Sequence, residues 1–84
     1  MIQLFEPFED ELEICSSGKN ILLKSKIPIP RCWIKVCDTI GKIVFKKIMN
    51  EMTELKISLN VIGGIYEVTI VSENRFTTKT VFLR

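Results

Sequence analysis

The end of the chain carries the pattern that most restricts the fold. Residues 65–72 alternate apolar and polar side chains, which is the period of a strand with one buried face. A turn at residues 72–75 and a second strand pattern at 76–83 follow, so the segment predicts a closing β-hairpin. Gly63 and Gly64 stand at its entry, where a tight corner favours a residue without a side chain. We expect Gly64, and also Gly41, to have a positive φ or to lie against neighbouring backbone.

Similar patterns recur along the rest of the chain, separated by turn residues at intervals of about ten residues. This spacing is typical of all-β folds. We therefore expect an immunoglobulin-like β-sandwich of about seven antiparallel strands, built as one domain of residues 1–84. The expected strands are 11–16, 20–26, 32–38, 42–49, 54–59, 65–72 and 76–83. Their apolar faces predict one core that contains Ile34, Val36, Leu55, Ile57, Tyr66, Val68 and Ile70.

Two segments between the expected strands need separate interpretation. Pro28 and Pro30 have no N–H to donate to a strand ladder, so they predict a crossover between strands rather than a central strand. Residues 48–55 have apolar residues at helical spacing, and a helix there would favour an oligonucleotide-binding barrel. The apolar alternation after Glu54 favours a loop followed by a strand instead.

The composition excludes most kinds of site chemistry. There is no histidine, so no cysteine has the usual base beside it, and no zinc ligand set is complete. The N-terminal acids, which are Glu6, Glu9, Asp10, Glu11 and Glu13, alternate with apolar residues as in a solvated face. The glycines do not have phosphate-loop or dinucleotide spacing. The sequence therefore predicts no catalytic residue, no metal ligand and no cofactor, and we expect the protein not to be an enzyme.

Cysteine count and hydropathy bear on the compartment. Cys15, Cys32 and Cys37 are an odd number, and we expect free thiols, with a bridge from Cys15 left open. No apolar run approaches the ~20 residues of a membrane helix. The first residues lack the basic start and apolar stretch of a signal peptide.

A nucleic-acid-binding barrel is the alternative that the side chains allow. Trp33 with Lys35, and Phe45 beside two lysines, have the residue types of a base-stacking surface. The net charge is only +2, however, which is small for a surface that binds phosphates. We therefore expect no nucleic-acid partner and no membrane insertion.

Three motifs, in order, carry a resemblance to a known family. The first is Pro7-Phe8-Glu9-Asp10-Glu11-Leu12-Glu13-Ile14, the second is Ile34-Lys35-Val36-Cys37-Asp38-Thr39-Ile40-Gly41-Lys42-Ile43-Val44, and the third combines Gly64-Ile65-Tyr66 with Thr78-Lys79-Thr80-Val81. Together they resemble the C-terminal sorting domain of the type IX secretion system of Bacteroidetes. They are also similar to related small exported β-sandwich proteins of unknown function. The first motif departs from the family pattern, because Phe5-Glu6 stands where Pro-Asn is typical.

The resemblance implies a non-enzymatic binding or export-recognition module outside the cytoplasm. Such a domain ends a larger secreted cargo and is recognised by the export machinery, so the expected partner is a protein. The expected location is the periplasm, the cell surface or the medium. The matching positions, taken as recognition residues, are Gly64, Tyr66, Thr78, Lys79 and Arg84. A structural module that self-associates through an edge strand is the alternative from a different class. We expect Lys79 to point to solvent because its charge is costly to bury.

Overall fold

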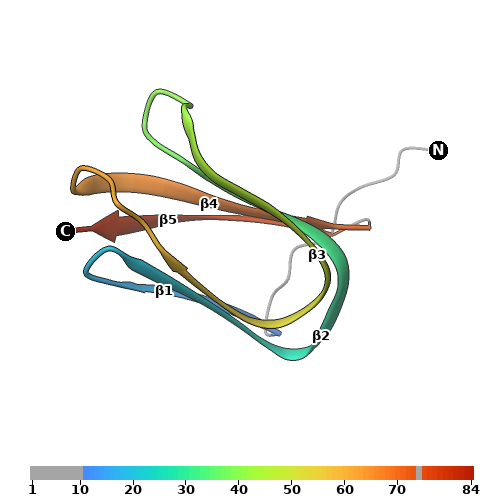
Figure 1. Cartoon of the computed structure of the whole chain (residues 1–84). Helices are drawn as coiled ribbons and strands as arrows, with labels where there is room; N and C mark the ends of the chain where they lie inside the picture. The colour runs from blue at the N-terminus through green and yellow to red at the C-terminus, as the bar shows by residue number, and fades with distance from the viewer. Residues whose placement is uncertain (1–10, 74) are drawn as a thin grey trace.

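The computed structural model describes residues 11–73 and 75–84, which form one antiparallel sheet (Figure 1). The expected all-β class is confirmed. Residues 7–10 of the first motif, and the acids before Glu11, lie outside the described residues. Within the described part, no helix is long and apolar enough to cross a membrane. The strands are β1 (Leu12–Ser17), β2 (Asn20–Cys37), β3 (Ile43–Ser58), β4 (Gly64–Ser72) and β5 (Arg75–Leu83).

The described chain has five strands rather than seven, because two pairs of expected strands are continuous. β2 contains both 20–26 and most of 32–38, and β3 contains most of 42–49 and 54–59. The two strands bend together and remain paired on both sides of the bend, from Asn20 opposite Ser58 to Cys37 opposite Ile43. One sheet that curls on itself therefore encloses the core, where we expected a sandwich of two sheets (Figure 1).

The prolines lie inside the central strand, contrary to the expected crossover. A register shift between Lys24 and Ile29 gives β2 an irregular stretch, and Pro30 lies beyond it opposite Glu51. β1 ends its pairing at Ser25, and β4 begins its pairing at Trp33. Residues 26–32 of β2 therefore pair with neither β1 nor β4. On that side of the strand no ladder bond is lost because a proline lacks its N–H.

A serine hydroxyl stabilises the carbonyl groups at this bend. Ser72 at the end of β4 is 2 % exposed, and its Oγ lies 3.2 Å from the Pro30 carbonyl oxygen and 3.1 Å from that of Arg31. Its single hydrogen is shared between these two acceptors. The last residue pair that joins β2 and β4 is Trp33 with Val71. The Ser72 hydroxyl extends the contact between these strands beyond that pair.

β2 is the central strand of the sheet on both sides of its bend. Its first arm lies between β1 and β3, and its second arm lies between β3 and β4. β5 pairs with β4 and returns alongside β1, so the sheet curls into a half-barrel (Figure 1). The inner faces of both arms supply the core, which is the expected one, with Leu55 partly buried at its margin. The buried cluster consists of Ile14, Ile21, Leu23, Ile29, Cys32, Ile34, Val36, Met52, Ile57, Tyr66, Val68, Ile70, Val81 and Leu83.

The Asp-x-x-Gly-Lys motif forms the turn between β2 and β3. Asp38 Oδ1 accepts hydrogen bonds from the backbone N–H groups of Ile40 at 3.0 Å and Lys42 at 2.8 Å. Gly41 has a φ of 88°, which confirms the expected positive value. The aspartate and the glycine thus have a folding role, because one satisfies the turn's donors and the other adopts its left-handed geometry.

We predict that Val68→Ala destabilises the protein by about 2 kcal/mol, because Val68 is fully buried and the change leaves a cavity. Chemical denaturation measures this loss. The matched control, Glu67→Ala, changes an exposed residue on the same strand and should stay within about 0.5 kcal/mol. Equal losses for the two variants would contradict the assigned face of β4.

We also predict that Ser72→Ala costs about 1–2 kcal/mol, because the Pro30 and Arg31 carbonyl groups lose the donor that the buried Ser72 hydroxyl supplies. Ser58→Ala is the control, since it removes an exposed hydroxyl bonded only to the Asn20 side chain at the other end of β3. If Ser72→Ala unfolds at the same denaturant concentration as the wild type, the hydroxyl does not support the bend.

Candidate recognition surface

The closing strand β5 presents different residues on its two faces. Val81 and Leu83 point into the core, where both are buried. Thr78 and Thr80 are exposed and lie on the opposite, outer face. Of the expected recognition residues on this strand, Thr78 is therefore the one available on the outer face.

The edge of β5 is closed by β1 without a backbone ladder. Arg75 forms a salt bridge with Glu11 at 2.8 Å, and Ser16 Oγ donates to the Phe82 carbonyl oxygen at 3.2 Å. At the far end, the Arg84 N–H donates to the Gly18 carbonyl oxygen at 2.9 Å. We call this row of contacts the seam. Because of the seam, the edge of the closing strand is not an open template for another strand.

Lys79 belongs to the seam as well as to the surface. It lies opposite Val68 on the inner face of the hairpin, at the edge of the sheet. Its residue is exposed, as expected, but its Nζ donates a hydrogen bond to the Ile14 carbonyl oxygen. The long side chain carries the charge out of the core to an acceptor on β1. Lys79 therefore links the two strands and does not simply point to solvent.

Gly64 and Tyr66 shape the entry to the closing hairpin. Gly64 has a φ of 156°, so its expected positive φ is confirmed, although a Cβ there meets open space. The crowded glycine is Gly63, where a Cβ would lie 2.9 Å from the Arg84 carbonyl carbon. Tyr66 is 7 % exposed, and its hydroxyl donates to the Ile62 carbonyl oxygen. These positions hold the corner and the end of β5 together.

The outer face of the sheet carries an exposed apolar row that crosses four strands. Trp33 on β2 lies between Ile48 on β3 and Val71 on β4, and Val71 lies opposite Phe76 on β5. Trp33 is 61 % exposed. Sequence reasoning identified Trp33 but missed the row, because cross-strand neighbours depend on register, which no local pattern gives.

A polar row lies beside the apolar one and includes Thr78. Lys46 lies opposite Lys35, Lys35 opposite Thr69, and Thr69 opposite Thr78. The hydroxyls of Thr69 and Thr78 are 3.2 Å apart, within hydrogen-bond distance. The two rows together give the outer face exposed apolar, hydroxyl and basic groups.

The described residues form no cluster of metal ligands, since no group of three or more potential ligands occurs among residues 11–73 and 75–84. The three cysteines are free, and burial raises the pKa of the Cys32 thiol, which keeps it in the unreactive protonated form. A hollow of about 770 Å³ in the described surface is lined by both carboxylates and amines but by no cysteine.

These features define a small all-β module. The sequence matches the family model of the secretion system C-terminal sorting domain over residues 6–84. The chain therefore belongs to this family, which confirms the resemblance seen in its motifs, and it is a secretion-sorting module of the type IX system. A comparison with curated proteins gives no significant match. The family is a family of sorting signals and not a known family of enzymes, and its members occur on proteins that are secreted or displayed on the cell surface.

The seam predicts a defined acid dependence. Arg75 holds the pKa of Glu11 below its ordinary value of 4.5, chiefly through their hydrogen bond. A lowered folded-state pKa contributes stability above that ordinary value, and the contribution is lost as the pH falls through the folded pKa. We therefore expect Glu11→Gln to lose less stability than the wild type as the pH falls from 7 to below 4.5.

Denaturant unfolding at several pH values measures this difference. The control is Glu13→Gln, which leaves the pair between Glu11 and Arg75 in place and should retain the wild-type acid loss. An unchanged acid loss in Glu11→Gln would mean that the pair does not close the seam in solution.

Proposed function

We propose that residues 1–84 act as one folded module whose outer face is read by a protein of the type IX export machinery, outside the cytoplasm. The observation that supports this proposal is the family match over nearly the whole chain, together with an exposed mixed surface that includes Thr78. Thr78 is a motif position whose side chain lies on that surface. It is therefore the residue we assign to direct partner contact.

The other recognition residues act in the proposal by holding this surface in shape. Lys79 and the backbone of Arg84 join β5 to β1. Gly64 and Tyr66 set the corner from which the hairpin starts. Since the edge of β5 is engaged, recognition of the hairpin relies on outer-face side chains and shape more than on main-chain pairing. The signal is then a property of the folded domain and not of a linear segment.

A fusion experiment tests the proposal. A reporter followed by residues 1–84, produced with an export leader in a cell that has type IX machinery, should reach the cell surface. Removing residues 81–84 is a poor test, because Val81 and Leu83 are core residues. Lys79→Ala also disturbs the seam.

Thr78→Glu is the sharper variant, because it places a charge on the outer face and leaves the core unchanged. We expect at least a tenfold loss of surface reporter, with an unchanged thermal melt. Thr39→Glu, the same change in the exposed turn between β2 and β3, should be exported normally. Normal export of folded Thr78→Glu would mean that the export machinery does not recognise the outer face. A folded wild-type fusion retained in the periplasm would contradict the function itself.

A further inference from the structure

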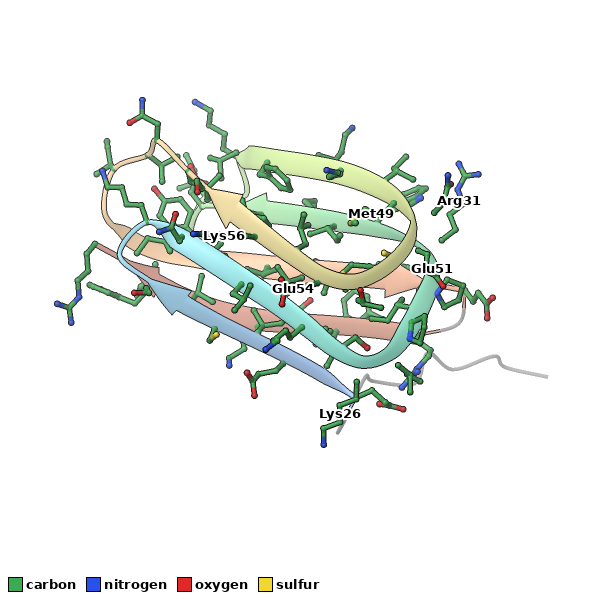
Figure 2. All side chains as sticks on the ribbon, turned by 60° about the horizontal axis from the view of Figure 1, so that its bottom comes forward. Lys26, Arg31, Met49, Glu51, Glu54 and Lys56 are labelled. Atoms are coloured by element: carbon green, nitrogen blue, oxygen red, sulfur yellow. The ribbon has the colours of Figure 1, made fainter. Side chains whose placement is uncertain are left out.

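β3 presents the open edge of this sheet. Within the described residues it pairs with β2 alone, whereas β5 is closed by the seam. Its sixteen residues run around the bend as an arch, with Met49 and Glu51 labelled around the bend and Glu54 and Lys56 on the arm that follows (Figure 2). The outward N–H and C=O groups of such a strand are a template for a further strand.

The charges along this edge change sign at the bend. The arm before the bend carries Lys46 and Lys47, whereas the bend and the arm after it carry Glu51, Glu54 and Lys56, so acids outnumber bases there. Lysines alone would repel an identical strand and protect the edge. A strand with opposite charges on its two arms is instead complementary to an antiparallel copy of itself, because each basic arm then meets an acidic one.

The faces of the two arms restrict how two copies can pair. Phe45 and Leu55 lie on the inner face, where both pack against the core. Lys46 and Glu54 are exposed on the outer face. Paired strands must match inner with inner and outer with outer residues, so a twofold axis has to pass through a residue rather than between two residues.

We propose that β3 pairs antiparallel with β3 of a second copy of this chain, about a twofold axis at Asn50. This axis sets Lys46 of each copy opposite Glu54 of the other, and Phe45 opposite Leu55. An axis at Met49 would set Lys46 opposite the buried Met52, and an axis at Glu51 would set it opposite Lys56. The axis at Asn50 alone among these three matches the faces and gives opposite charges.

The proposed pairing also relieves an unfavourable contact within each chain. Lys46 lies directly opposite Lys35 on β2, and like charges in cross-strand pairs are destabilising. In the described part of the chain, neither Lys46 nor Glu54 forms a salt bridge. A second copy supplies a carboxylate beside this pair of amines. It does so twice per dimer because of the symmetry. The inference does not depend on the proposed export function.

Charge reversal with the whole 84-residue chain tests the pairing. Sedimentation equilibrium should show a concentration-dependent dimer for the wild type. Lys46→Glu and Glu54→Lys each place like charges opposite one another twice across the proposed interface, so each should raise the dimer dissociation constant by about tenfold. Glu54→Lys also places a lysine opposite Lys24 of its own chain, so its effect on folding is measured separately. An equimolar mixture of the two variants should recover wild-type affinity, because an acidic edge then meets a basic one. Lys47→Glu is the matched control and should have a smaller effect, since it faces the uncharged Thr53 in this register.

Carbodiimide cross-linking of mixed light and isotope-labelled chains identifies the register. Cross-links between Lys46 and Glu54 should join light to heavy chains. A wild type that stays monomeric at high micromolar concentration would overturn the proposal. So would a dimer whose variants show no recovery on mixing, or one whose cross-links join other residues. Circular dichroism confirms that each exposed substitution leaves the fold intact.

Discussion

The structure depends on one bent strand. β2 pairs with β1, β3 and β4, so every register in the sheet is set directly or indirectly by its path. Because β2 bends and keeps β3 paired through the bend, a single sheet lines both sides of the core. The bend is placed by the prolines and the register shift and is supported by the buried hydroxyl of Ser72. A straight β2 would leave the inner residues of one arm without facing partners.

The way the curled sheet is closed decides which surfaces are available. β1 and β5 meet through an ion pair, two side-chain hydrogen bonds to carbonyl groups and one backbone hydrogen bond. These contacts occupy the edge of the closing strand and leave its outer face exposed. They also leave β3 as the strand with an open edge in the described part of the chain. The proposed recognition by the export machinery is centred on the outer face at Thr78, and the proposed pairing with a second copy on the edge of β3, with Lys46 in both surfaces.

Much of the fold follows from local sequence patterns. The closing hairpin, the turn at Asp38 and the buried faces of the strands were predictable, because side-chain alternation and turn chemistry act over a few residues. The continuity of β2 and β3 was not predictable in this way. Pro28 and Pro30 are compatible with either a break or a bend, and the choice depends on pairing with a strand that lies later in the chain.

The residues of the candidate site were likewise predictable only in part from local sequence patterns. Motif matching selected Thr78, which lies on the outer face, and also Tyr66, which is buried and supports the corner. The hydrogen bond of Lys79 joins residues 65 positions apart, so no local pattern reveals it. The apolar row around Trp33 was likewise missed, since it exists only once four strands are in register. Sequence thus indicated the family and the strand that carries the motif, while the surfaces themselves required the structure.

The continuity of β2 and β3 through the bend is the central claim, and nuclear Overhauser effects between protons on opposite strands test it most directly. If the two strands are continuous, one sample should show cross-strand contacts between Leu23 and Leu55 before the bend, Ile29 and Met52 within it, and Cys32 and Met49 beyond it. Loss of the contact between Ile29 and Met52, with sequential helical or loop contacts across residues 48–53, would mean that the chain breaks there into separate strands and would contradict the single curled sheet.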